Sequence, residues 1–162
     1  MLSIRPATIK DVPLLKTLIR ELAVYDRLDT EAAVTEEDIK RDGFGPSPKF
    51  RVVIAESDGQ VAGYALFFEF YSSFQGHAGL FLDDIFVREP FRKKGVGKAL
   101  LAHVAGIALK ENYFCIRCET LDWNNAAIEF YRQQGAMFMD EWKSVCLVGG
   151  SLESVATEGT SK

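Results

Sequence analysis

The stretch from Leu80 to Lys98, LFLDDIFVREPFRKKGVGK, constrains the fold more than any other part of the chain. Its first half is an apolar, β-branched run that carries Asp83 and Asp84, and this pattern predicts a strand. A basic glycine loop follows and opens an amphipathic segment that predicts a helix. Such a junction can direct backbone N–H groups and the positive end of a helix dipole at a phosphorylated ligand, with two carboxylates beside it.

The loop Arg92–Lys98 has the chemistry of an anion site. Gly95 and Gly97 lack Cβ atoms, so the backbone can turn successive N–H groups toward one point. The whole chain holds 19 basic and 23 acidic residues, so a basic cluster is a local exception. A concentrated anion is the expected partner, and a solvated turn at a helix start is the alternative interpretation. The basic side chains around the loop are Arg92, Lys93, Lys94 and Lys98.

Two common phosphate motifs do not fit this loop. A P-loop requires four residues between its glycines and then a Lys-Ser/Thr pair, which the sequence GVGKA does not supply. A dinucleotide fingerprint requires a third glycine three residues after the second, where this chain has Leu100. Both interpretations are therefore excluded.

The loop resembles motif A of the GCN5-related N-acetyltransferase (GNAT) superfamily, Arg/Gln-x-x-Gly-x-Gly/Ala, at Arg92, Gly95 and Gly97. Residues 121–136 resemble motif B of the same superfamily, N-x-x-A-x-x-F/L-Y-x-x-x-G. The stretches 20–28, 42–45 and 121–124 are similar to the diamine, spermidine/spermine and thialysine acetyltransferase branch, and the resemblance covers residues 3–148. One departure is that the branch usually has Glu-Asp where this chain has Asp83-Asp84.

The resemblance implies an α/β GNAT fold, in which a mixed central sheet with a splayed parallel strand pair is flanked by helices. It also implies acetyl-CoA as the cosubstrate, a small-molecule amine as the acceptor and a homodimer. Related enzymes often admit the pantetheine arm between the splayed strands. By the same resemblance, the residues that contact coenzyme A are Ile85, Phe86, Val87, Arg92, Lys93, Lys94, Gly95, Val96, Gly97, Lys98, Asn124, Ala127, Phe130 and Arg132.

Two side chains are candidates for acid–base chemistry. An alkyl ammonium has a pKa near 10.4, so only about one molecule in 2,500 is a free amine at neutral pH. The Asp83 carboxylate is the candidate base, acting through water, with a helix cap or a salt bridge as the alternative role. Tyr131, the motif-B tyrosine, is by resemblance the acid for the departing thiolate, and core packing is its alternative role. Strand alternation places Asp84 on the face opposite Asp83 unless the strand is bulged.

The acceptor is predicted to be cationic. Residues 20–42 hold eight acidic side chains, Glu31 among them, against four basic ones, although most of these belong to a solvated face. The resemblance implies a channel for a diamine, a polyamine or a lysine analogue. The residues expected to bind this substrate are Tyr25, Asp26, Phe74, Asp84, Glu141 and Trp142.

Apolar periodicity predicts an alternation of strands and helices. Thr8 with Asp11, and Thr35 with Asp38, are helix-start patterns, and Asp58-Gly59 predicts a hairpin turn. We expect helices from Thr8 to Tyr25, from Thr35 to a break at 42–48, and over 97–111 and 124–134. We expect strands over 3–7, 50–56, 61–70, 79–87, 113–120, 136–139 and 142–148.

Length and composition predict one domain over residues 1–150 and a short polar tail over 151–162. No apolar run approaches the roughly 20 residues that span a bilayer, and the N-terminus lacks a signal-peptide core, so a cytoplasmic location is expected. Cys115 and Cys118 lie on a predicted strand, three residues apart, and His77 and His103 are the only histidines, which disfavours a metal site. A net charge of −4 disfavours nucleic acid as a partner.

Two alternatives to a small-molecule acetyltransferase stay open. A non-catalytic sensor of acyl-coenzyme A would keep Gly95 and Gly97 but would need neither Asp83 nor Tyr131, so the presence of both favours an enzyme. An acetyltransferase of the same fold could also act on a protein or amino-acid amine.

Overall fold

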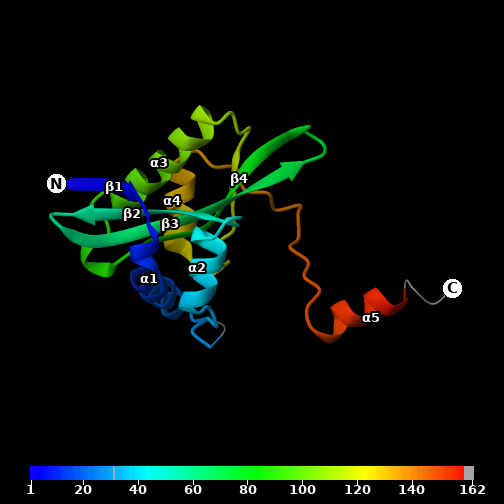
Figure 1. Ribbon diagram of the computed structural model, residues 1–162. Coiled ribbons are helices and arrows are strands. Elements are labelled where there is room, and N and C mark those ends of the chain that lie inside the picture. The colour runs from blue at the N-terminus through cyan, green and yellow to red at the C-terminus, as the bar shows by residue number, and fades with distance from the viewer. Residues whose placement is uncertain (31, 159–162) are drawn as a thin grey trace. The chain divides into compact units, whose positions relative to one another are not determined.

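The computed structural model describes residues 1–30 and 32–158, so Glu31 and the last four residues of the predicted tail lie outside the described residues. The chain forms two compact units, Met1–Leu121 and Asp122–Lys162 (Figure 1). One domain over residues 1–150 therefore stays a prediction.

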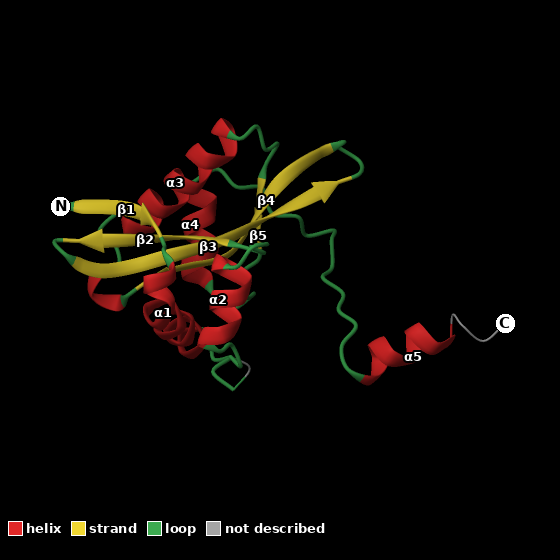
Figure 2. Ribbon diagram, in the orientation of Figure 1, coloured by secondary structure: helices red, strands yellow, loops and turns green. Residues whose placement is uncertain are grey.

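A mixed five-stranded sheet is the centre of the first unit (Figure 2). The first four strands pair antiparallel in chain order, and the last pair is parallel, as a GNAT fold requires. The strand order across the sheet is β1 (Leu2–Pro6), β2 (Arg51–Ser57), β3 (Gln60–Ser72), β4 (His77–Val87) and β5 (Ile116–Cys118).

Helices cover both faces of this sheet. Helices α1 (Val12–Tyr25) and α2 (Glu36–Phe44) pack on one face, and α3 (Val96–Lys110) packs on the other (Figure 1). Adjacent strand residues alternate between these two cores, so Val52 faces α1 and α2 while Val53 faces α3. The alternation means that each polar residue of a strand can be assigned to one of the two helical layers.

The predicted helix starts are confirmed. Thr8 donates its backbone N–H and its hydroxyl to the Asp11 carboxylate, which opens the short helix η1 (Ile9–Asp11) before α1. The backbone N–H of Asp38 donates to the Thr35 hydroxyl over 3.1 Å at the start of α2. Each bond satisfies a helix terminus that would otherwise lack a partner.

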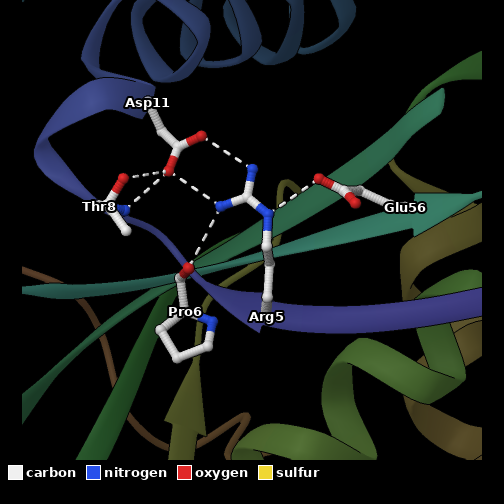
Figure 3. A network of polar contacts seen from close by, with 5 residues as sticks. All are labelled: Arg5, Pro6, Thr8, Asp11 and Glu56. Carbon is white, nitrogen blue, oxygen red and sulfur yellow. Dashed lines mark hydrogen bonds and ion pairs between the residues drawn. The ribbon is translucent and has the colours of Figure 1, made fainter. Parts of the chain in front are cut away.

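A polar network joins β1, η1 and β2 (Figure 3). The Arg5 guanidinium donates two hydrogen bonds to Asp11, at 2.8 and 2.9 Å, and one to Glu56 at 2.9 Å. The hydrogen bonds from Arg5 hold the pKa of Asp11 well below its usual range. This network fixes the start of the first helix against the edge of the sheet.

The expected β2–β3 hairpin turn is also confirmed, with Asp58 and Gly59 at φ 51° and 78°. Positive φ at both central residues matches the right-handed twist of the strands that the turn joins. The predicted strand 113–120 is shorter in the structure, where it spans Ile116–Cys118.

The second unit differs from the prediction after its first helix, α4 (Asn125–Gln133). The strands expected at 136–139 and 142–148 are absent from the described residues, which have no regular structure there. The apolar pattern of a strand is present, but a strand also needs a partner to take its backbone hydrogen bonds. A helix, α5 (Gly150–Glu158), then forms where a polar tail was expected. Among the described residues, no helix combines the length and the apolar character needed to cross a bilayer.

Candidate functional site

A β-bulge lies at the two adjacent carboxylates of β4. Leu66 of β3 is paired with Asp84 and Phe67 with Leu82, so Asp83 is an extra residue without a partner on β3. Leu82 belongs to the core under α3, whereas Phe86 belongs to the core under α1 and α2. The bulge therefore shifts the alternation of β4, so that Asp84 shares a face with Leu66 and Phe86. The strict opposition of Asp83 and Asp84, expected for a regular strand, does not hold here.

Asp84 is held by a buried tyrosine of the neighbouring strand. The Tyr64 hydroxyl donates to Asp84 Oδ2 over 2.8 Å, and Tyr64 itself is 0% exposed. The pKa of the half-buried Asp84 is raised to about 6, chiefly by burial; the Tyr64 hydrogen bond opposes this rise, and the negative charges of Asp83 and Asp26 add to it. Burial and the Asp84 charge raise the pKa of Tyr64 well above its usual value, so Tyr64 remains a donor.

Asp83 has a more open environment than Asp84. Asp83 is an exposed residue. Partial burial of its carboxylate, and to a lesser extent the charge of Glu119, nevertheless raise its pKa. A carboxylate with a raised pKa takes up a proton more readily near neutral pH than an ordinary aspartate does. Both acids of the bulge are therefore chemically suited to accept a proton.

The C-terminal end of α1 brings a third carboxylate to the same face. Burial raises the pKa of Asp26, and its charge in turn raises the pKa of Asp84. None of Asp26, Asp83 and Asp84 forms an ion pair with a basic side chain in the described part of the chain. Partly buried carboxylates without a basic partner favour the binding of a cation.

Two residues predicted for different ligands are in contact in the structure. The Arg92 guanidinium lies 4.4 Å from the centroid of the Tyr25 ring and 5.8 Å from that of Phe86. Arg92 Nε also donates to the carbonyl of Val87 over 2.8 Å. The Arg92 side chain is thus part of the packing between α1 and the end of β4.

The basic loop has the backbone geometry expected of an anion site. Lys93 and Gly95 have φ of 58° and 82°, and Gly95 precedes α3 without any side-chain cap. The first backbone bond of α3 runs from Ala99 N–H to the Gly95 carbonyl at 2.9 Å, so the N–H groups of the preceding turn have no partner within the helix. Gly95 can adopt this left-handed conformation without strain because it has no Cβ.

Exposed lysines surround this uncapped helix start. Lys93, Lys94 and Lys98 are exposed and form no ion pair within the described residues. Val96 differs from them, because its side chain is 3% exposed and packs under α3. Of Val96, only the backbone N–H is suited to face a ligand.

The parallel pair β4–β5 is splayed, as predicted. Pairing is limited to Leu80–Leu82 with Ile116–Cys118, and β4 continues to Val87 without β5 beside it. Ile85 and Val87 are half-buried against the α3 core, and Phe86 is buried on the other face. The backbone of β4 beyond Leu82 therefore offers a free edge where an extended ligand can bind.

The motif-B residues lie in the second unit. The Asn124 side chain accepts from the backbone N–H of Ala127 over 3.1 Å and caps α4. The rings of Phe130 and Tyr131 meet edge to face at 5.2 Å, and Tyr131 is 7% exposed. Arg132 stacks over the ring of Phe138. Glu141 and Trp142 are exposed in the irregular segment after α4.

Phe74 is not brought together with the other predicted substrate residues of the first unit. It lies in the turn of the β3–β4 hairpin, whose far end projects beyond the other strands in Figure 1, and it is 91% exposed.

The sequence analysis did not identify Tyr64 as a residue of the site. The available signal was a single hydroxyl in the otherwise apolar strand run from Val61 to Phe68.

A cleft of about 850 Å³ lies between α1, the start of α2 and the end of β4. It borders the packing of Arg92 on Phe86 but not the carboxylates of the bulge. Its polar lining is mixed in charge, and Arg88 there is bound by Glu21 through two hydrogen bonds. Residues 1–30 and 32–158 contain no group of three or more His, Cys, Asp or Glu side chains placed to hold an ion.

Comparison with protein-family models gives a match to the acetyltransferase (GNAT) family over residues 15–136. Thialysine N-epsilon-acetyltransferase of Sus scrofa is 32% identical over 164 residues, which cover 94% of this chain and 96% of that protein. L-ornithine N5-acetyltransferase of Arabidopsis thaliana is also 32% identical, over 94% of this chain and 86% of its own length.

Solved structures with the same fold include an integron cassette protein from the mobile metagenome of V. cholerae. It superposes with a TM-score of 0.80 at 23% identity and covers 96% of this chain and 97% of its own. An aminoglycoside acetyltransferase from an uncultured soil metagenomic sample has a TM-score of 0.74 at 16% identity, covering 91% of this chain and 95% of its own. At these identities the similarity shows the fold alone.

Proposed function

The chain belongs to the acetyltransferase (GNAT) family and is an N-acetyltransferase, and we propose that it transfers the acetyl group of acetyl-CoA to a primary amine of a small cationic molecule. The observation that carries this proposal is the presence of half-buried carboxylates, Asp26 and Asp84, without a basic partner in the described chain. An ammonium group supplies the missing positive charge, and it is also the group to be acetylated.

The acceptor class is a diamine, a polyamine or a lysine analogue. Relatives named for thialysine, for L-ornithine and for spermidine and spermine match this chain at 32% identity. These molecules share a primary amine and a second charged group on a flexible chain. We assign the second group to the acidic end of α1, with Tyr25 and Asp26, and retain Phe74, Glu141 and Trp142 as proposed contacts.

Acetyl-CoA binds at the basic loop and along β4. The uncapped start of α3 and its exposed lysines suit the pyrophosphate, because backbone N–H groups and positive charge converge there. The free edge of β4 beyond Leu82 suits the pantetheine arm, which carries amide groups able to pair with a strand. This arrangement leads the thioester toward the bulge of β4.

Acetyl transfer requires the acceptor ammonium to lose a proton, because only about one molecule in 2,500 is a free amine at neutral pH. A carboxylate of the bulge accepts it, Asp83 being the residue expected from the sequence and Asp84 its neighbour. The amine then attacks the thioester carbonyl, and Tyr131 protonates the sulfur that leaves. Tyr131 stands in this role as the motif-B tyrosine.

The proposal is tested by mixing the purified protein with acetyl-CoA and a panel of amines and measuring the release of free thiol. We expect turnover with diamines and lysine analogues and a KM at least about tenfold higher for a monoamine of the same length, since one charged hydrogen bond contributes about 1.5–3 kcal/mol. Tight binding of acetyl-CoA without thiol release for any amine would contradict the proposal and support a sensor of acyl-CoA. Turnover with lysine-containing peptides alone would place the acceptor on a protein.

We also propose that the enzyme is a cytoplasmic homodimer. Several apolar residues of the segment after α4 are exposed in the single chain, Met137 at 92%, Val145 at 88% and Trp142 at 67%, and a second copy can cover them. Sedimentation equilibrium measures the mass in solution. A mass of one chain across the concentration range used for the assay would contradict the dimer.

A further inference from the structure

Tyr64 is the one fully buried tyrosine in the described chain, and the proposed reaction as outlined above does not use its hydroxyl. It lies on β3 among the apolar residues under α1 and α2, with Leu66 and Phe86 in the same core. A buried hydroxyl costs stability unless it makes a hydrogen bond, and its partner here is Asp84 Oδ2 at 2.8 Å. The strand thus retains a polar group whose bond is made to an acid of the bulge.

We propose that Asp84 is the group that accepts the proton of the acceptor ammonium, and that Tyr64 is the positioning residue that holds it for this purpose. The inference rests on the proposed amine acetylation and decides between the two acids of the bulge. It assigns Asp83 to the open side of the bulge, where it contributes charge.

The geometry favours Asp84 because only this acid has a defined orientation. Tyr64 binds one oxygen, and Asp84 Oδ1 accepts no hydrogen bond from the described residues. No buried side-chain oxygen or nitrogen in residues 1–30 and 32–158 lacks a partner, so Oδ1 is not sealed inside the core. Asp83 lies at the unpaired position of the bulge and accepts no side-chain hydrogen bond within the described chain.

The environment of Asp84 also suits a base at neutral pH. Burial, then the charges of Asp83 and Asp26, raise its pKa to about 6 against the opposing bond from Tyr64. A base with a pKa just below the working pH is mostly ionised and still accepts a proton effectively. The titratable groups that face Asp84 are Tyr64 on β3, Asp83 on its own strand and Asp26 at the end of α1.

One N–H bond of the acceptor ammonium breaks, and its proton passes to Asp84 Oδ1 while the nitrogen keeps the electron pair. That pair forms the new N–C bond to the acetyl carbon of acetyl-CoA. The C–S bond then breaks and its electron pair leaves on sulfur. A second N–H bond of the former ammonium group also breaks, and the proton it releases balances the one that the sulfur takes. The products are the acetylamide and coenzyme A, and Asp84 returns its proton to solvent.

The substitution Tyr64→Phe tests the positioning role. It removes a donor that stabilises the charged carboxylate, so the pKa of Asp84 rises. We expect the acidic limb of the kcat/KM profile to move upward by about one pH unit, the value of one charged hydrogen bond, and activity at pH 6 to fall about fivefold. An acidic limb that stays in place would overturn the inference.

Tyr113→Phe is the matched control. The Tyr113 hydroxyl also donates to a carboxylate, Glu69, over 2.8 Å, so the same atom is removed from the same kind of bond. Neither Tyr113 nor Glu69 has a place in the proposed site. We expect an unchanged pH profile for this variant.

The two acids are compared directly in a second set of variants. Asp84→Asn should lower kcat/KM by about a hundredfold or more. In that background, a further Tyr64→Phe change should have no additional effect on kcat/KM. Asp83→Asn should lower kcat/KM by less than tenfold, as expected when a nearby charge is lost and the base is kept. The reverse order, with Asp83→Asn the more damaging, would overturn the assignment. This comparison does not depend on Tyr64→Phe folding well.

A measurement that does not require enzymatic turnover tests this inference separately from the proposed function. Carbon-13 NMR of the aspartate carboxyl groups reports the titration of Asp84 in the parent and in Tyr64→Phe. An upward shift in the variant supports the positioning role, and no shift contradicts it, whether or not any amine is acetylated. Absence of turnover in the parent contradicts the proposed function instead.

Discussion

Arg92 stacks on Tyr25, with its guanidinium carbon 4.4 Å from the ring centroid. Arg92 belongs to the motif expected to bind the cofactor, and Tyr25 belongs to the helix expected to line the amine channel. Because the same guanidinium donates to the Val87 carbonyl, it joins the end of β4 to the end of α1. A change at Arg92 is therefore expected to affect the binding of both substrates.

Arg92→Ala removes this packing together with one positive charge of the loop. We expect KM to rise for both acetyl-CoA and the amine, each by about threefold to tenfold, since a cation–π contact of this kind contributes about 0.5–2 kcal/mol. Arg92→Lys keeps the charge but loses the planar group that stacks and bonds. Steady-state kinetics with each substrate varied in turn measures both constants, and a normal KM for the amine in both variants would contradict the stacking role.

Gly97→Val should weaken acetyl-CoA binding. A branched side chain in the first turn of α3 keeps the pyrophosphate from the backbone N–H groups, and the loss of one charged hydrogen bond of about 1.5–3 kcal/mol raises KM about tenfold or more. Gly106→Val is the control, because it places the same residue in the same helix at a position where a Cβ meets nothing within 4 Å. Equal KM values for acetyl-CoA in the two folded variants would remove the loop from the cofactor site.

Asp84→Asn should stabilise the folded protein at pH 7 to 8. The pKa of Asp84 is about 6 in the folded state and about 3.9 in the unfolded state, so the ionised carboxylate destabilises the native state above about pH 6. The free energy of unfolding of the parent therefore falls as pH rises from 4 to 7, by about 1–3 kcal/mol for this group. Urea unfolding of both proteins across this range measures the difference. A parent stability that is independent of Asp84 ionisation would show that the carboxyl is solvated.

Tyr131→Phe removes only a hydroxyl from a buried ring, so folding and acetyl-CoA affinity should change little. If the hydroxyl protonates the leaving thiolate, kcat falls by about ten- to a thousand-fold, and residual turnover is expected because a thiolate leaves readily. Pre-steady-state thiol release and calorimetric binding of coenzyme A separate the two effects. Weaker cofactor binding with a normal kcat would make Tyr131 a packing residue.

Asp11→Asn should destabilise the first helix and the sheet edge. Arg5 holds the pKa of Asp11 below its usual range, so this stabilisation is complete above about pH 3.9 and is lost as pH falls through the lower folded pKa. We expect a loss of about 1–3 kcal/mol at pH 7, because the half-buried guanidinium of Arg5 loses one of its two carboxylate partners and keeps only Glu56. Asp42→Asn, which removes an exposed ion pair with Arg41, should have a much smaller effect. Thermal unfolding at pH 7 and at pH 2 tests both statements.

Local patterns predicted most of the first unit correctly. Pairs such as Thr8 with Asp11 and the turn Asp58-Gly59 act over three or four residues, so their outcome depends little on the remaining chain. The two strands expected after α4 were wrong for the opposite reason. Their apolar pattern is local, but a strand exists only where another strand accepts its backbone bonds, and the described residues provide none there.

The sequence by itself determined that Asp83 and Asp84 lie on a strand that leads into a basic, glycine-containing helix start, because adjacency and periodicity are properties of the chain. Only the tertiary structure decided what each carboxylate does there. The bulge depends on the pairing of β4 with β3, and the bond from Tyr64 joins residues 20 positions apart. Burial, hydrogen-bond partners and pKa values arise when distant segments meet, so no local pattern distinguishes the two acids.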